Sequence, residues 1–220
     1  MPTRQHYLEK LEELQKGIIE MGALTLKALE KSVEAFRNQD TESAQEVIEG
    51  DEQINRLEVA LNEKCALLIA EEQPVAKDLR IILNAVRACY DIERIADNAV
   101  HISKCTINLA EENYIEPVGQ LLKMPPIVFD MLRDSLDVYL SLDTEKATEI
   151  SMRDRHVDRL YSTLFSELVE YMHENPDKID QGVSMIFMGR RFERIADHTT
   201  HICEGAIYTA TGRHIELKND

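Results

Sequence analysis

The pentapeptide Glu-Arg-Ile-Ala-Asp occurs at residues 93–97 and again at residues 193–197. Upstream of each copy lies a second pair of related segments, DTESAQE at 40–46 and DTEKATE at 143–149. A single repeated pentapeptide could arise by chance, but several matching blocks in the same order indicate an internal duplication. The sequence therefore predicts two copies of one structural unit.

Each copy is predicted to contain three helices. Apolar residues recur at intervals of three and four along nearly the whole chain, and no segment shows the alternation of a half-buried strand. Asp40 and Asp143 are suited to cap helix N-termini, while Pro74 and Pro176 occupy matching positions at which a new helix begins. We expect an all-α fold of two tandem three-helix bundles, with six long antiparallel helices. The two units are residues 1–116 and 117–220.

Composition restricts the function classes. The formal net charge is −16, with 41 acidic residues against 25 basic ones. Nucleic acids and anionic lipids both select basic surfaces, so neither nucleic-acid binding nor direct membrane insertion is expected. No apolar stretch reaches the length of a membrane span, and the N-terminus lacks a signal-peptide core. The four cysteines show no C-x-x-C spacing, which is typical of a reducing compartment, and we expect a cytoplasmic protein.

The first Glu-Arg-Ile-Ala-Asp lies on a helix that is apolar on two sides. Glu93, Asp97 and His101 are spaced four residues apart and continue a stripe that is apolar upstream. A helix with two apolar sides should be central in its bundle, and carboxylates placed there need a neutralising group. The upstream stripe consists of Leu79, Leu83, Val86 and Tyr90, and the opposite one of Ile81, Ala88, Ile92, Ile95, Ala99 and Ile102.

Counting outward from the turn at Pro74 identifies partners for these carboxylates. Asp51 and Asp97 each lie 23 residues from Pro74, and Asn55 and Glu93 each lie 19 residues from it. In an antiparallel hairpin, residues equally distant from the turn lie at one level. The four side chains are therefore predicted to form one oxygen-rich cluster.

The second copy repeats this arrangement about Pro176. Asp154 and Asp158 precede the proline by 22 and 18 residues, and Asp197 and Glu193 follow it by 21 and 17. Converging carboxylates repel one another unless a cation or protons compensate. Each copy is thus a candidate metal site, and the second is the more acidic.

The donor atoms suit several metals. Oxygen ligands favour ferric iron, manganese, magnesium or calcium, and nearby histidines would also admit zinc or ferrous iron. These histidines are His101, His198 and His201. The alternative is that the carboxylates lie on solvated helix faces and form ordinary ion pairs with Arg56, Arg94, Arg159 and Arg194. Recurrence at matching heights in both copies favours metal sites.

Catalytic signatures are scarce. The sequence has no glycine-rich phosphate loop, nucleophile elbow or cysteine metal motif. Glu170 and His173 form a single Glu-x-x-His, whereas a di-iron carboxylate bundle needs two such motifs. We therefore expect no enzyme, with a carboxylate-bridged dinuclear metalloenzyme kept as one alternative and a metal-free helical scaffold as another.

Several segments together resemble the PhoU family of bacterial regulators of phosphate uptake. They are DEQINRLE at 51–58, QPVAKDLR at 73–80, DIERIADN at 91–98 and RRFERIADH at 190–198. The resemblance spans nearly the whole chain and implies two related three-helix bundles. It also implies metal clusters held by paired E/D-x-x-x-D motifs.

Carried over residue by residue, these motifs match Glu93/Asp97, Glu193/Asp197 and Asp154/Asp158, whereas Asp51 is followed by Asn55 and loses one charge. The chain departs from the family pattern in two further ways. Ala96 and Ala196 replace the usual glycine, and His101 and His201 replace the usual asparagine. The histidines remain compatible with metal binding, so we keep them as candidate ligands.

The resemblance further implies a non-enzymatic, cytosolic negative regulator. Such a protein would restrain the phosphate ABC transporter through its ATPase subunit and repress the phosphate-starvation response through a phosphate-sensing histidine kinase. The resemblance also implies a homodimer, brought to the inner membrane by its partner proteins.

Overall fold

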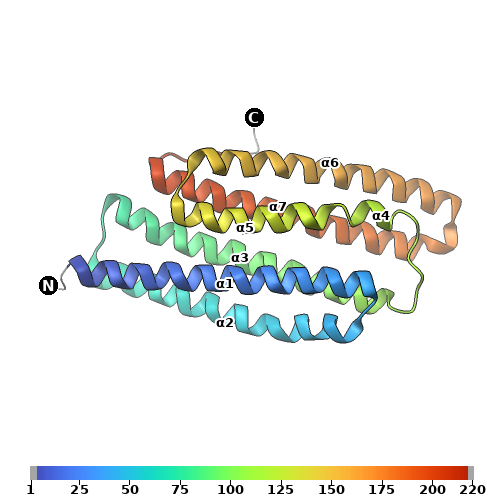
Figure 1. Cartoon of the computed structure of the whole chain (residues 1–220), viewed down its shortest axis with the longest axis horizontal. Coiled ribbons are helices and arrows are strands. Elements are labelled where there is room, and N and C mark those ends of the chain that lie inside the picture. Colours follow the sequence, from blue (N-terminus) through green and yellow to red (C-terminus); the bar gives the residue numbers. More distant parts are fainter. Residues whose placement is uncertain (1–3, 218–220) are drawn as a thin grey trace.

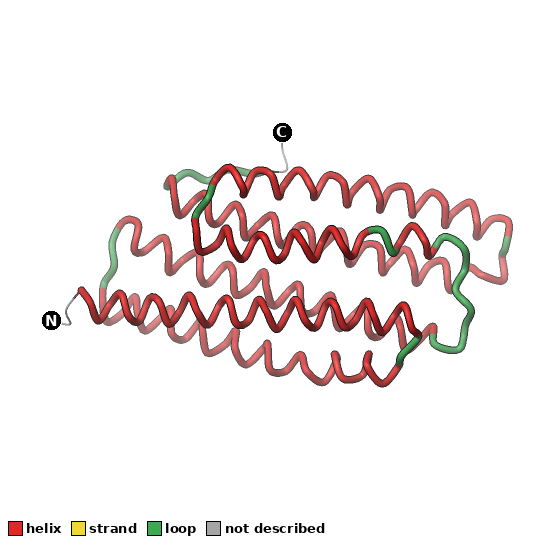
Figure 2. Tube along the Cα trace, viewed as in Figure 1, coloured by secondary structure: helices red, strands yellow, loops and turns green. Residues whose placement is uncertain are grey.

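The computed structural model describes residues 4–217, which are helical apart from short connections and contain no strand (Figures 1 and 2). The helices are α1 (Arg4–Asn38), α2 (Thr41–Glu72), α3 (Ala76–Leu109), α4 (Val118–Leu121), α5 (Met124–Ser141), α6 (Thr144–Glu174) and α7 (Ile179–Thr211), with a 3-10 turn at Pro176–Lys178.

The helices form two three-helix bundles that lie side by side (Figure 1). Helices α1, α2 and α3 pack against one another in the first bundle, and α5, α6 and α7 do so in the second. The bundles meet mainly along α3 and α7, with α1 against α5. This confirms the predicted all-α fold of two tandem three-helix bundles with six long helices.

The second bundle has a short additional helix, α4, ahead of its first long helix, and the sequence did not predict it. The short α4 ends at Leu121, and α5 begins at Met124 with Pro125 and Pro126 in its first turn. A proline lacks the N–H that would bond to the carbonyl four residues earlier, so a continuous helix cannot pass this point.

The two predicted N-caps are confirmed. The Asp40 carboxylate accepts a hydrogen bond from the backbone N–H of Ser43 at the start of α2. The Asp143 carboxylate accepts from the N–H groups of Glu145 and Lys146 at the start of α6. Both therefore satisfy N–H groups that have no partner within their helix.

Helices α3 and α7 run antiparallel along the seam between the bundles. Three contacts mark their register: Arg80 with the carbonyl of Thr209, Asn84 with Gly205, and Cys105 with the carbonyl of Ser184. The Asn84 side chain lies directly against Gly205, because an added Cβ would lie 2.0 Å from its side-chain oxygen. A glycine is therefore required at this position if Asn84 keeps its place.

One side of α3 differs from the prediction. The helix is central, and Ala88, Ile92, Ile95, Ala99 and Ile102 are buried as expected. The other stripe, however, leaves the side chains of Leu83, Val86 and Tyr90 exposed. Helices α1, α2 and α7 cover the remaining sides of α3, so this strip faces outward.

Candidate functional site

The predicted residues of the first acidic cluster lie on neighbouring helices, α2 and α3. The Asn55 amide donates a 3.0 Å hydrogen bond to the Asp51 carboxylate one turn earlier on α2. Burial raises the pKa of Asp51, and the negative charge of Asp97 on α3 raises it further. Asp51 therefore lies close enough to Asp97 for the charge of that carboxylate to act on it, whereas the full cluster of four side chains stays a prediction.

Arg94 neutralises the α3 side of this cluster. Its guanidinium lies 2.5 Å from the Glu93 carboxylate and 3.0 Å from that of Asp97. Glu93 is only 8% exposed, and burial raises its pKa. The ion pairs of Arg94 agree with the alternative to a metal site, in which an arginine compensates the charges of Glu93 and Asp97.

Both hairpins nevertheless keep oxygen atoms without a protein donor. Among the described residues, buried oxygens of Asp51, Asn55 and Asp158 accept no hydrogen bond from the protein. A buried polar oxygen without a donor costs free energy, and a bound cation would remove that cost. These atoms fit the carbonyl and carboxylate donors that hard metal ions select.

The second hairpin repeats the arrangement with its own arginine. Asp154 is buried and Asp158 half-buried on α6, and both precede the turn to α7. On α7, Glu193 forms an ion pair with Arg190 one turn earlier. The charge of Glu193 also reaches Tyr161 of α6, whose pKa is raised first by burial and then by this carboxylate. Helices α6 and α7 therefore meet near the level of the predicted cluster.

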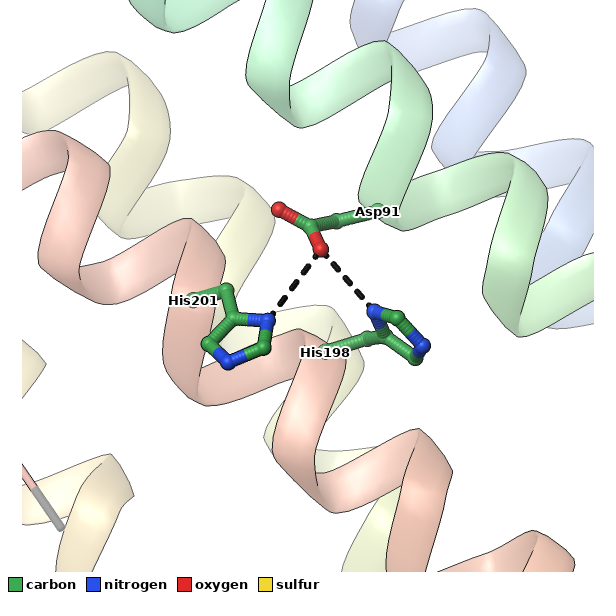
Figure 3. Close-up of side chains that lie close together, drawn as sticks. All are labelled: Asp91, His198 and His201. Atoms are coloured by element: carbon green, nitrogen blue, oxygen red, sulfur yellow. Dashed lines mark hydrogen bonds and ion pairs between the residues drawn. The ribbon is translucent and has the colours of Figure 1, made fainter.

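A different group has the closest arrangement of ligand atoms. Within residues 4–217, one set of three His, Cys, Asp or Glu side chains brings its ligand atoms within 4.8 Å of one another. It consists of Asp91 on α3 with His198 and His201 on α7 (Figure 3). We call it the seam triad, since it joins the two bundles.

Hydrogen bonds hold the seam triad together. One oxygen of Asp91 lies 2.9 Å from Nδ1 of His198 and 3.3 Å from Nδ1 of His201 (Figure 3). The two histidines are one helical turn apart on α7, so both rings reach the same carboxylate across the seam. Tyr90 adds an edge contact to the His198 ring, with ring centroids 6.5 Å apart.

Burial and charge shape the protonation of the triad. The side chains of Asp91 and His198 are 6% and 12% exposed, whereas His201 is 43% exposed. Burial alone would raise the pKa of Asp91, but hydrogen bonds from both histidines outweigh it and lower the pKa. The hydrogen bond to Asp91 raises the pKa of His201. The carboxylate is thus charged, and the arrangement favours a positive charge beside it.

The triad opens onto a recess at the surface of the seam. The recess has a volume of about 720 Å³ and is lined by Asp91 and His201 together with Val86, Arg87, Tyr90, Glu204 and Glu216. Solvent and small solutes can therefore reach His201 and the outer side of the carboxylate.

The sequence identified only part of this group. The sequence predicts His198 and His201 as possible metal ligands beside the α7 carboxylates of their own hairpin, whereas both bond to Asp91 of the other bundle. Asp91 was missed, because counting from Pro74 relates α2 to α3 and says nothing about contacts between the bundles. The H-x-x-H spacing at 198–201 was the available signal.

The other expected histidine, His101, lies on the same seam. Burial of its ring, followed by the positive charge of Arg191 on α7, lowers its pKa. His101 therefore has an arginine close by, and its role as a ligand of the α2–α3 cluster stays a prediction.

Fold and site together define a class of protein: a duplicated three-helix bundle with an E/D-x-x-x-D pair on the closing helix of each copy. The PhoU domain model matches residues 18–106 and again residues 121–206. The chain belongs to the PhoU family.

Relatives and solved structures agree with this assignment. The chain is 36% identical to the phosphate-specific transport system accessory protein PhoU homolog of Clostridium acetobutylicum, over 99% of this chain and 100% of that protein. It is 32% identical to the phosphate-specific transport system accessory protein PhoU of Escherichia coli, over 94% and 87% of the two chains.

Among solved structures, the crystal structure of PhoU from Pseudomonas aeruginosa superposes with a TM-score of 0.91 at 34% identity, covering 94% of this chain and 100% of that one. The phosphate transport system regulatory protein PhoU from Streptococcus pneumoniae gives a TM-score of 0.90 at 30% identity, over 96% and 99% of the chains.

Proposed function

We propose that this protein is a non-catalytic regulator of a phosphate-specific transport system. The observation that carries the proposal is the match to proteins named as accessory or regulatory components of that system, over nearly the full length of both chains. The fold places the Glu93/Asp97 and Glu193/Asp197 pairs on α3 and α7, the two adjacent central helices. Its proposed action is to restrain phosphate import when phosphate is abundant.

The proposed partners are the ATPase subunit of the phosphate ABC transporter and the phosphate-sensing histidine kinase. No helix within residues 4–217 is long and apolar enough to cross a membrane. We propose that the protein works in the cytoplasm as a homodimer and reaches the inner membrane through these partners.

Metal ions are proposed to bind the two acidic hairpin faces. The proposed ligands are Asp51, Asn55, Glu93 and Asp97 in the first copy, and Asp154, Asp158, Glu193 and Asp197 in the second. Support comes from the buried oxygens without protein donors and from the charge contact between Asp51 and Asp97. Oxygen donors favour iron, manganese, magnesium or calcium, and zinc becomes a candidate if His101 contributes.

A metal-free scaffold is the second candidate. It is favoured by Arg94, which pairs with both Glu93 and Asp97 and leaves that side of the cluster already neutralised. In this alternative the acidic faces bind a basic partner directly. Partner binding that high salt abolishes and a chelator leaves intact would favour the scaffold over the metal-dependent regulator.

Complementation tests the regulatory proposal. A bacterial strain lacking its own PhoU protein receives this gene, and phosphate uptake and a starvation-response reporter are measured in high phosphate. We expect lower uptake and a repressed reporter. No change in either quantity, with the protein present at normal amounts, would contradict the proposal.

Elemental analysis tests the metal component separately. The protein is purified without chelator, and the metal content is compared with that of the combined variant Glu93→Gln and Glu193→Gln. Glu52→Gln is the matched control, since Glu52 is exposed on α2 and pairs with Arg56. A metal content that the combined variant leaves unchanged would remove metal binding at these faces from the proposal.

A further inference from the structure

The seam between α3 and α7 contains two equivalent positions created by the duplication. In the repeat alignment that superposes the two Glu-Arg-Ile-Ala-Asp segments, Asp91 corresponds to Arg191, Asn98 to His198, and His101 to His201. Because the two helices are antiparallel, each position combines one residue of one helix with two of the other. Asp91 faces His198 and His201, and the charge of Arg191 reaches His101.

The two positions now carry opposite chemistry. At the first, a carboxylate and two imidazoles converge, and their ligand atoms all lie within 4.8 Å of one another. At the second, the repeat alignment has Arg191 where the first has the carboxylate and Asn98 where the first has one imidazole, and the charge of Arg191 acts on His101. A positive charge repels a metal cation, so only the first position is suited to bind one.

The spacing at the first position fits a small metal ion. Ligand atoms around a tetrahedral zinc ion, at bond lengths of about 2.0–2.1 Å, lie roughly 3.3 Å apart. The Asp91 oxygen lies 2.9 and 3.3 Å from the two Nδ1 atoms. These two distances match the zinc spacing to within a few tenths of an ångström, and all the ligand atoms lie within 4.8 Å of one another. Binding of an ion also requires the loss of the protons in these hydrogen bonds.

We infer that Asp91, His198 and His201 bind one divalent transition-metal ion of the zinc class, which links the two bundles across the seam. Two imidazoles and one carboxylate select zinc over magnesium or calcium, which prefer oxygen ligands. The recess beside His201 leaves the fourth coordination position to water or to a small ligand. The inference does not depend on the proposed function, because none of the three residues belongs to an E/D-x-x-x-D pair.

The alternative is a purely structural hydrogen-bonded contact. Asp91 accepts from both rings, and this satisfies the buried carboxylate without any ion. The two explanations differ in what Asp91→Asn does. An amide oxygen can still accept hydrogen bonds from both rings, but it is a neutral and much weaker ligand for zinc.

The experiment uses the full chain in a variant whose acidic faces lack four of their carboxylates. The background carries Glu93→Gln, Asp97→Asn, Glu193→Gln and Asp197→Asn, so that metal binding at those residues cannot mask the seam. Zinc is titrated by calorimetry, and cobalt is titrated as a spectroscopic probe whose visible absorption reports tetrahedral nitrogen and oxygen ligation. We expect one ion per chain, with excess magnesium unable to displace it.

Loss of ligands is tested next in this background. Asp91→Asn, His198→Gln and His201→Gln are each expected to weaken zinc binding at least tenfold and to abolish the cobalt spectrum. The control is His156→Gln, since His156 is an exposed histidine of α6 away from the seam. Binding that survives all three variants, or that the control weakens equally, would overturn the inference.

A second test looks for a gain of metal binding, which a misfolded variant could not produce. The combined substitution Arg191→Asp and Asn98→His rebuilds the triad at the second position, where His101 is already present. We expect the stoichiometry to rise from one zinc ion per chain to two. A variant that is folded by circular dichroism and still binds one ion or none would contradict the assignment of the ligand set.

Discussion

Replacing Gln181 by leucine should destabilise the junction between the two bundles. Gln181 is 1% exposed near the start of α7 and contacts the segment that links the copies. Its side-chain oxygen accepts a 2.7 Å hydrogen bond from the Ile115 N–H, and its amide donates to the Glu112 carboxylate at 2.8 Å and to the Asn113 carbonyl at 3.2 Å. Leucine has a similar volume but cannot form any of these bonds.

The magnitude follows from these three bonds. Each contributes about 0.5–1.5 kcal/mol net, and a buried N–H left without an acceptor costs about 1–3 kcal/mol. Since Ile115 is buried, its N–H would lose its acceptor without gaining water. We expect the free energy of unfolding to fall by about 2–4 kcal/mol, which lowers the melting temperature by roughly 4–16 °C in a chain of this size.

Urea unfolding followed by circular dichroism measures this loss. Gln45→Leu is the matched control, because Gln45 is exposed on α2 and bonds only to Glu49 one turn away. The control should change the free energy of unfolding by less than about 0.5 kcal/mol. A loss below about 1 kcal/mol for Gln181→Leu, at an unchanged denaturant slope, would refute the view that this side chain fastens the linking segment to α7.

The remaining predictions concern the core, the seam triad and a cap. Ile95→Ala should lower the free energy of unfolding, measured by chemical denaturation, by about 2–5 kcal/mol. Leu83→Ala, on the exposed strip of the same helix, should lower it by less than about 1 kcal/mol. Equal losses would contradict the described assignment of the buried and exposed sides of α3. The pair of Asp91 and His201 should stabilise the folded protein most between about pH 4 and 6.5. The lowered pKa of Asp91 adds stability above the pKa that Asp has in the unfolded chain, and the raised pKa of His201 adds stability below the pKa that His has there. Asp91→Asn should therefore flatten the pH profile of urea unfolding on both sides of this range, and an unchanged profile would show that the pair does not titrate as described. Asp143→Ala should lower the free energy of unfolding by about 1 kcal/mol, measured by thermal unfolding, because the α6 cap is lost. Asp143→Asn should keep most of the stability, since an asparagine oxygen can also cap the helix. An equal loss in both variants would argue against capping as the cause.

The fold was predictable because local signals agree with the duplication. The apolar periodicity, the caps at Asp40 and Asp143 and the matching prolines all indicate six helices in two sets of three. The short α4 was not predicted, because the four residues Val118–Leu121 are too few to show a helical apolar period. The exposed strip of α3 was also missed, since a helical wheel shows which residues share a face but not which neighbours cover it.

The candidate site was predictable only within a hairpin. Counting from Pro74 brings Asp51 and Asp97 to one level, and the charge of Asp97 does raise the pKa of Asp51, because a turn fixes the register of the two helices that it joins. The four-residue cluster as a metal site stays a prediction. The seam triad depends on how two bundles pack, and no turn fixes that register. Asp91 could therefore be joined to His198 and His201 only from the three-dimensional structure.

Gly205 has a consequence that extends beyond its own contact with Asn84. It lies one helical turn beyond His201 on α7, and its lack of a side chain leaves room there for the Asn84 amide of α3. Any larger side chain there would have to displace the Asn84 amide from its place in the seam. A residue that offers no functional group thus makes room for an amide of the other bundle, one turn from a histidine that bonds to the Asp91 carboxylate.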